Sequence, residues 1–161
     1  MRNIKTYLMK KIALIFLIIL ISCSKKQENI NIEKNININW TEFNSKDSIP
    51  KQLKYVLQAI NGDAKIADKN EAYEATDNIN DTTIPTRQLR MLARKNENWR
   101  LVYKQGGIGT YYVYIQCKIK SDTLYDLKTG NTLLNLENND SISKFISNKA
   151  LKLTEIKTRN K

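Results

Sequence analysis

The sequence contains no histidine, and this absence restricts the chemistry that the protein can perform. Without an imidazole side chain, catalysis by a Ser-His-Asp or Cys-His arrangement is excluded, and so are histidine-ligated metals. The chain has only two cysteines, which also excludes a four-cysteine zinc site. A binding function, or an enzymatic one that uses carboxylates, is compatible with this composition.

Acidic side chains are scarce relative to basic ones. The 161 residues include 27 Lys and Arg against 16 Asp and Glu, which gives a formal net charge of +11. A basic balance is typical of proteins that meet nucleic acid, an anionic membrane surface or another polyanion. The chain is also rich in Lys, Asn and Ile, whose codons are AT-rich, so we interpret the charge first as a result of genome composition. The length allows one domain after removal of a targeting segment.

Long apolar runs are confined to the N-terminus. Residues 1–11 carry basic and no acidic side chains, and residues 12–21 (IALIFLIILI) are entirely apolar. This run is too short to span a bilayer, which needs about 20 residues, but it matches the apolar core of a secretory signal, which has about 7 to 15. The N-terminus therefore predicts export.

A four-residue motif ends the apolar run. Leu20-Ile21-Ser22-Cys23 resembles the lipobox of bacterial lipoproteins, in which an aliphatic residue, a tolerant position and a small residue precede a cysteine. The resemblance covers residues 1–23 only, and an ordinary secretory peptide is the alternative. It implies that residues 1–22 are a signal peptide cleaved after Ser22 and that Cys23 is acylated. Each buried methylene contributes about 0.8 kcal/mol, so two or three acyl chains anchor a protein stably.

The expected location follows from this resemblance. Ser24, rather than Asp, follows the cysteine, as in lipoproteins that move to the outer membrane of Gram-negative bacteria. We therefore expect a protein of the cell envelope that faces the periplasm and contacts the lipid bilayer through Cys23. Acylation of Cys23 leaves Cys117 without a disulfide partner, and we expect Cys117 to be a buried structural thiol.

The segment after Cys23 is polar. Residues 23–47 are rich in Lys, Asn, Glu and Ser, which is typical of a solvated tether. Isoleucine recurs at even positions in this segment, and this period of two predicts an edge strand over residues 36–43. We expect a single domain over residues 48–153 and a basic tail over residues 154–161.

Apolar periodicity in residues 48–153 predicts an α+β fold. A helix is expected over residues 50–61, because apolar residues recur there with helical spacing, and a second over residues 64–76, capped by Asp63. From Arg87 the period changes to two, which predicts an antiparallel meander of about four strands. A C-terminal helix capped at Asp140 or Ser141 follows. The first helix carries the stripe Leu53, Val56, Leu57 and Ile60.

The expected arrangement has the two N-terminal helices on one face of the meander and leaves the other face partly open. Cystatin-like and nuclear-transport-factor-like folds have such an arrangement, but the comparison is an analogy only. If the strands alternate regularly, arginine and tyrosine side chains share the partly open face. Arginine offers bidentate donors and tyrosine a hydroxyl and a ring, which suit phosphate or carboxylate ligands. A solvated sheet face is the alternative. The candidate residues are Arg90, Arg94, Arg100, Tyr112 and Tyr114.

Two acidic residues of the predicted second helix are a further candidate. Asp68 and Glu71 have a spacing of three, which would allow them to act as an acid/base pair or to hold a divalent cation. Lys65 and Lys69 alternate with them, however, and this pattern is typical of an exposed face with salt bridges. We therefore predict neither a catalytic residue, nor a metal site, nor a cofactor.

The sequence as a whole favours a membrane-anchored lipoprotein with a small non-enzymatic binding or accessory domain. Its partner would be an unknown protein or an anionic small molecule, and not nucleic acid, which an exported protein seldom meets. A carboxylate-dependent periplasmic hydrolase and an immunity-type toxin inhibitor are the alternatives.

Overall fold

The computed structural model describes residues 39–43, 45–76, 81–107 and 109–157. The predicted signal peptide, the lipobox at Ser22 and Cys23 and most of the predicted tether lie outside the described residues. In the part of the chain that is described, no helix is long and apolar enough to cross a membrane.

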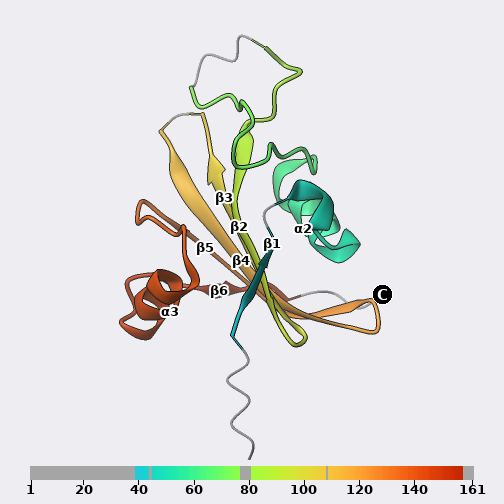
Figure 1. The fold of residues 1–161 in the computed structure, drawn as a ribbon, viewed down its shortest axis with the longest axis vertical. Helices are drawn as coiled ribbons and strands as arrows, with labels where there is room; N and C mark the ends of the chain where they lie inside the picture. Colours follow the sequence, from blue (N-terminus) through green and yellow to red (C-terminus); the bar gives the residue numbers. More distant parts are fainter. Residues whose placement is uncertain (1–38, 44, 77–80, 108, 158–161) are drawn as a thin grey trace, which may run out of the picture. The chain divides into compact units, whose positions relative to one another are not determined.

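The described residues form one antiparallel sheet of six strands in the order β1-β2-β3-β4-β5-β6 (Figure 1). Each strand pairs with the strand that follows it in the sequence, so the sheet is a meander. The strands are β1 (Thr41–Phe43), β2 (Arg87–Lys95), β3 (Asn98–Gln105), β4 (Tyr111–Lys120), β5 (Thr123–Thr132) and β6 (Thr154–Glu155).

Two α-helices and one turn of 3-10 helix accompany the sheet in the described residues. The 3-10 turn η1 (Lys46–Ser48) leads into α2 (Lys51–Asn61), which ends where Gly62 adopts a left-handed φ of 82°. The second helix, α3 (Asn139–Ser147), follows β5. Its N-cap is Asn138, whose side chain accepts a hydrogen bond from the backbone N–H of Ser141.

The predicted fold is wrong in its helices and in its strand count. Residues 64–76 are not helical, so one N-terminal α-helix rather than two packs on the sheet. The sheet has six strands, because β1, which lies within the edge strand predicted over residues 36–43, and β6, which lies within the predicted tail 154–161, extend the four-stranded meander. Ala67 instead bridges the edge of β2, because its N–H donates to the carbonyl of Arg87 and its carbonyl accepts from Leu89. Asp63 also accepts from the N–H of Lys65, and such local bonds compete with a helix.

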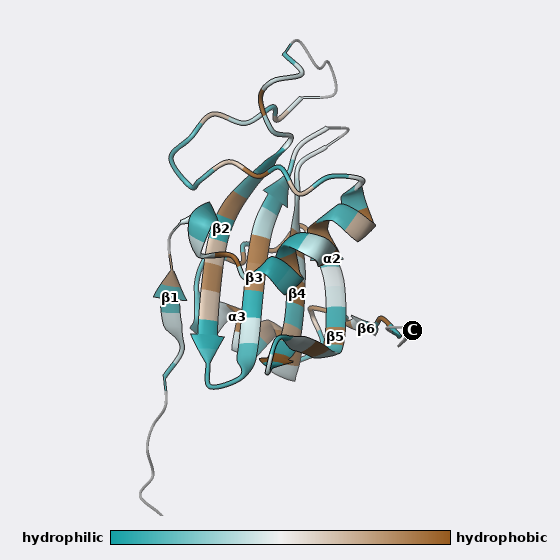
Figure 2. Ribbon diagram, turned by 90° about the vertical axis from the view of Figure 1, so that its right-hand side faces the viewer, coloured by the Kyte–Doolittle hydropathy of each residue, from teal (hydrophilic) through white to brown (hydrophobic). Residues whose placement is uncertain are grey.

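Both faces of the sheet are covered, which corrects the expectation of a partly open face. Figure 2 shows α2 lying across the near face of the sheet and α3 behind it. Leu53 of α2 packs on strand side chains such as Leu101 and Ile115, and together they form one apolar cluster. The side chains on the other side, including Met91, Val102 and Ile142, form a second. We call these two surfaces the α2 face and the α3 face.

A bulge in β2 determines which side chains reach each face. The register of β2 against β3 shifts between Leu89 and Met91, so Arg90 is an extra residue on β2. As a result, Leu89 and Leu92 pack on the α2 face, whereas Met91 and Ala93 pack on the α3 face. A strict alternation would place Leu89, Met91 and Ala93 together.

The chain after α3 passes very close to β5. A Cβ atom added to Gly130 would lie 2.4 Å from the backbone carbonyl oxygen of Lys152 and 3.3 Å from a methyl of Leu151. Only glycine leaves room for this approach. Leu151 thereby reaches the apolar cluster of the α3 face, where it is buried.

A candidate ligand groove between α2 and β5

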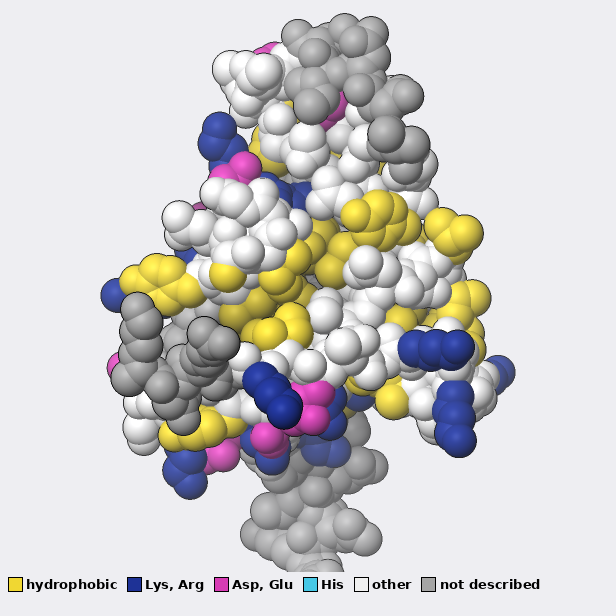
Figure 3. All heavy atoms as spheres, turned by 180° about the vertical axis from the view of Figure 1, so that it is seen from behind, with side chains coloured by type: hydrophobic (Ala, Val, Ile, Leu, Met, Phe, Trp, Pro, Cys, Tyr) yellow, Lys and Arg dark blue, Asp and Glu magenta, His cyan; other side chains and the backbone are white. Residues whose placement is uncertain are grey.

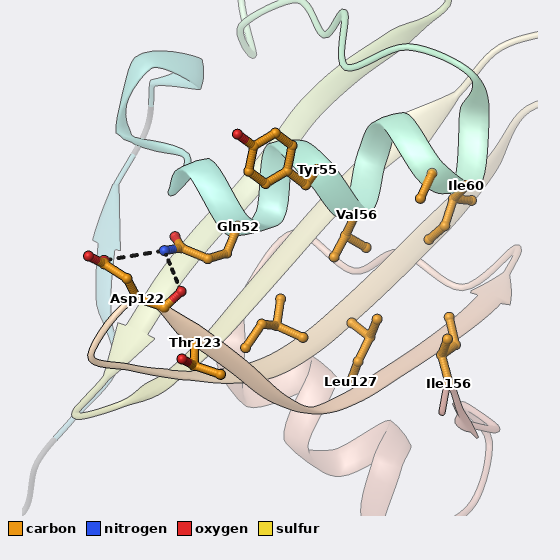
Figure 4. Close-up of a pocket in the computed structure, with 10 residues that line it drawn as sticks. Gln52, Tyr55, Val56, Ile60, Asp122, Thr123, Leu127 and Ile156 are labelled. Carbon is orange, nitrogen blue, oxygen red and sulfur yellow. Dashed lines mark hydrogen bonds between the residues drawn. The ribbon is translucent and has the colours of Figure 1, made fainter. Parts of the chain in front are cut away.

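An open groove of about 560 Å³ lies between α2 and the hairpin that joins β4 to β5 (Figure 4). We call it the α2–β5 groove. Two rows of α2 side chains with a spacing of four form its wall, one with Val56 and Ile60 and the other with Tyr55 and Ala59. The groove is therefore bounded by one flank of a helix and by the last long strand of the sheet.

The position of α2 explains why this flank stays open. Leu53 and Leu57 are each 1% exposed and hold α2 against the middle of the sheet. The flank of α2 that faces β5 stays accessible to solvent: its residues Tyr55 and Ile60 are 57% and 43% exposed. Figure 3 shows hydrophobic side chains gathered in a hollow near the middle of this side of the molecule.

Residues from distant parts of the sequence complete the groove. Leu127 of β5 lies opposite α2, and Ile156 lies at the far end (Figure 4). Leu124 of β5 also lines the groove. The backbone N–H of Ile156 donates to the carbonyl of Leu127 at 2.9 Å, which fixes this end. Seven of the ten lining residues are aliphatic or aromatic, and the others are Gln52, Asp122 and Thr123.

Hydrogen bonds close the other end of the groove. The side-chain amide of Gln52 donates to the backbone oxygen of Asp122 at 3.0 Å and to its carboxylate at 3.3 Å (Figure 4). Asp122 is the one acidic residue in the lining. The Nζ of Lys51 lies 5.5 Å from the ring centre of Tyr55, and Ile156 is flanked in the sequence by the exposed residues Glu155 and Lys157. The groove is thus mostly apolar, with polar side chains at the end where Gln52 meets Asp122.

Two of the arginine and tyrosine candidates meet at a carboxylate. The guanidinium of Arg90 pairs with Glu137, and the hydroxyl of Tyr112 donates to the same carboxylate at 3.3 Å. The hydrogen bond from Arg90 lowers the pKa of Glu137, and burial raises the pKa of Tyr112. This group connects β2 and β4 to the segment that leads into α3.

Two other candidates are buried beneath α3. Arg100 is 8% exposed, and its guanidinium lies 3.9 Å from the ring centre of Trp40 and donates to the side chains of Asn139 and Ser143. Tyr114 is fully buried and donates to the side chain of Gln116 at 2.6 Å. Burial raises the pKa of Tyr114 to about 12. Arg100 thus holds α3 to the sheet, and Tyr114 packs in the apolar cluster beneath α3.

The last candidate, Arg94, lies on the opposite face. Its guanidinium is 5.4 Å from the ring centre of Trp99, which stacks on Phe43 and belongs to the α2 face. Arg94 also donates to the backbone oxygen of Asn96. The structure therefore divides the five candidates among three environments and does not bring them together in one open surface.

The remaining reactive groups have structural partners. Glu71 is exposed and lies 2.5 Å from the ammonium of Lys46, a hydrogen bond that lowers the pKa of Glu71, and the carboxylate of Asp68 accepts from the backbone N–H of Lys46. Cys117 is buried on the α2 face, and burial raises the pKa of its thiol to about 12. Among the residues that the structure describes, no group of three or more acidic or thiol side chains is placed to hold a metal ion.

Sequence reasoning missed the groove. The signal was present in part, since Tyr55 and Ala59 widen the apolar stripe of α2 beyond what Leu53 and Leu57 need to pack on a sheet. The rest of the groove is formed largely by β5, and no local sequence pattern specifies where β5 lies relative to α2.

Comparison with known proteins gives no family for the chain. No family model matches it, and neither a curated protein nor a solved structure is significantly similar.

Proposed function

We propose that this chain is a bacterial lipoprotein, anchored in the envelope through Cys23, whose domain binds an apolar ligand in the α2–β5 groove. The groove is the observation that carries the proposal. Both faces of the sheet are otherwise covered, yet Tyr55 and Ile60 stay exposed along an open hollow. Ligand sites are commonly apolar concavities of about 300 to 1,000 Å³ with a few polar groups, and the groove lies within this range.

The lining favours binding over catalysis. General acid/base chemistry needs a positioned proton donor and acceptor. The groove offers a single carboxylate, that of Asp122, and Gln52 donates to it. The buried thiol of Cys117 belongs to the core and does not line the groove. We therefore propose an accessory or carrier role for a domain held near the bilayer.

Filling the groove tests the binding proposal. Ala59 is exposed and lines the groove, so Ala59→Phe places a ring in the hollow without disturbing the core. We expect this change to weaken binding of the neutral dye Nile red about tenfold, because the apolar volume is occupied. Fluorescence titration of the mature chain, residues 24–161 preceded by Cys23→Ala, gives the affinity.

The neighbouring residue supplies a matched control. Gln58 is exposed on the same helix but does not line the groove, so Gln58→Phe adds a similar ring elsewhere. This variant should bind Nile red as the parent does. Equal affinity of the parent and of Ala59→Phe would show that the dye binds elsewhere and would overturn the proposed groove.

Removal of the acceptor cysteine tests the anchor. In cells fed labelled palmitate, the parent chain should take up label and fractionate with membranes, whereas Cys23→Ala should take up none and appear in the soluble or unprocessed fraction. Cys117→Ala is the control, because it removes the other thiol and should leave labelling unchanged. A Cys23→Ala chain that still carries palmitate would refute the anchor.

A further inference from the structure

We propose that a polar pocket at the edge of the sheet, where β1 meets the start of α3, binds a neutral saccharide. The pocket has no lining residue in common with the α2–β5 groove, so this inference goes beyond the proposed function and does not depend on it. Three features of the described residues carry it: the aromatic ring in the lining, the mixture of hydrogen-bond donors and acceptors around that ring, and the balance of charge.

The pocket has the size of a small-ligand site. Its volume is about 400 Å³, within the range of about 300 to 1,000 Å³ that is common for such sites. One side is formed by β1 and the residues just before it, and the other by the N-cap and first turn of α3. The lining residues are Asn39, Trp40, Glu42, Asn138, Asn139 and Asp140.

Contacts with Arg100 hold the two sides of the pocket in place. The guanidinium of Arg100, which is 8% exposed, lies 3.9 Å from the ring centre of Trp40 and donates to the side-chain oxygen of Asn139 at 3.2 Å. The amide of Asn139 in turn donates to the carboxylate of Glu42 at 2.7 Å. Because a buried side chain fixes the ring and this carboxylate, binding has less conformational entropy to lose.

The lining offers the groups that recognise a sugar ring. A sugar hydroxyl both donates and accepts hydrogen bonds. The carboxylates of Glu42 and Asp140 accept from hydroxyls in short, strong bonds. The side-chain amides of Asn39 and Asn138 are donors, since only the oxygen of Asn138 is used to cap α3. The half-buried ring of Trp40 supplies an apolar surface for the C–H groups of a sugar.

The balance of charge argues against ionic ligands. A helix N-terminus by itself attracts anions, but two carboxylates line this pocket, and no lysine or arginine of the described residues does. A cation is disfavoured as well, because Arg100 already lies on the ring of Trp40 and its charge offsets part of that of the carboxylates. No aliphatic side chain of the described residues lines the pocket, which argues against an acyl chain. A neutral ligand rich in hydroxyls is the class that fits.

Titration with two neutral disaccharides tests the inference. Maltose and N,N′-diacetylchitobiose are added separately to the isotope-labelled mature Cys23→Ala chain, and the amide and indole signals are followed by NMR. At least one sugar should shift the indole signal of Trp40 and the backbone signals of residues 138–140 with one common affinity. If neither sugar does so at millimolar concentration, the saccharide assignment is wrong.

Three variants locate the sugar. Asp140→Ala removes a hydroxyl acceptor from an exposed position and should weaken binding about fivefold, the effect of one hydrogen bond. Asp47→Ala is the matched control, because Asp47 is an exposed acid in the first turn of η1 and does not line the pocket. It should bind as the parent does, and equal losses in the two variants would place the sugar elsewhere. Trp40→Leu should weaken binding about tenfold, and an unchanged affinity would remove the ring from the site.

A charged analogue separates a saccharide site from a cation site. Chitobiose has the same two rings as N,N′-diacetylchitobiose but carries protonated amines at about pH 6. It should bind no more tightly than the neutral sugar, and tighter binding that Asp140→Ala abolishes would overturn the neutral saccharide in favour of a cation. Ala59→Phe should bind the sugar as the parent does, so this inference and the proposed groove are tested separately. A loss of sugar binding in Ala59→Phe would place the sugar in the groove and refute the assignment to this pocket.

Discussion

The two faces of the sheet bury different kinds of side chains. The cluster on the α2 face has thirteen buried residues, nearly all aliphatic, and the one on the α3 face has seven. The smaller cluster is supported by polar contacts, since Arg100 stacks on Trp40 and donates to α3, and Arg90 pairs with Glu137. The α2 face has the larger apolar cluster, beside which the buried Arg87 pairs with Asp63, whereas the α3 face combines a smaller apolar cluster with the contacts of Arg90 and Arg100.

This difference explains where an open site can exist. On the α3 face, the contacts of Arg90 and Arg100 help to close the helix onto a small core, so little surface is left free. On the α2 face, Leu53 and Leu57 secure the helix, and its outer flank is not needed for packing. Basic and aromatic residues, which resemble a ligand site in the sequence, are therefore used for structure, while the open groove is apolar.

The largest expected effect comes from a cavity on the α2 face. Leu101 is fully buried there, and Leu101→Ala should lower the free energy of unfolding by about 2 to 5 kcal/mol. Leu133→Ala is the control, because Leu133 is 84% exposed and should change stability by less than about 0.5 kcal/mol. Urea unfolding of the mature Cys23→Ala chain measures both. A cost below about 1 kcal/mol for Leu101→Ala would contradict an apolar origin of stability on this face.

The next effect tests the close approach on the α3 face. Gly130→Ala should destabilise by about 1 to 3 kcal/mol, because the new methyl meets the backbone oxygen of Lys152, which cannot rotate away. Asn131→Ala, at an exposed position of the same strand, should be nearly neutral. If unfolding in urea shows the two variants to be equally stable, the segment around Lys152 does not pack on β5 as described.

The elements with a regular local pattern were the predictable part of the fold. The apolar stripe of residues 50–61 coincides with α2, and the alternation after Arg87 coincides with β2 to β5. The stretch 64–76 was mispredicted because its helix signals are weak and its backbone bonds to β2 instead. A bridge to a strand twenty residues later is tertiary structure, and local periodicity does not report it.

The grouping of the candidate residues depends on tertiary structure for the same physical reason. Grouping Arg90 with Arg94 requires an unbroken alternation along β2, but the bulge at Arg90 places their side chains in different environments. Arg100 was expected on an open face, and α3 covers it. The groove depends on where Tyr55, Leu127 and Ile156 meet in space, so only the structure reveals it.

A smaller effect compares two cation–aromatic contacts, one on each face of the sheet. Arg100 is buried against Trp40 on the α3 face, whereas Arg94 is exposed above Trp99 on the α2 face. A double-mutant cycle of Arg100→Met with Trp40→Leu should give a coupling energy of about 1 to 2 kcal/mol, because this contact is shielded from water. The cycle of Arg94→Met with Trp99→Leu should give about 0.5 kcal/mol. Equal coupling energies from urea unfolding would remove the distinction between the faces.

The smallest effect is the pH dependence of the ion pair on the α3 face. The hydrogen bond from Arg90 lowers the pKa of Glu137 in the folded chain below its unfolded value. The pair therefore stabilises the fold fully above the ordinary glutamate pKa of about 4.3, and this stabilisation is lost as the pH falls through the folded pKa.

Glu137→Gln removes this titration. The variant should be less stable than the parent at pH 7 by no more than about 1 kcal/mol, because the pair is partly exposed, and the difference should shrink as the pH falls below about 4. Urea unfolding across this pH range gives the difference directly. Glu71→Gln provides the comparison beside α2, since the pKa of Glu71 is also lowered but its pair with Lys46 is exposed and sensitive to salt. In 1 M NaCl the pH dependence of the stability difference between parent and variant should persist for Glu137→Gln and vanish for Glu71→Gln. Its loss at both sites would mean that the α3 face does not shield its charges from solvent.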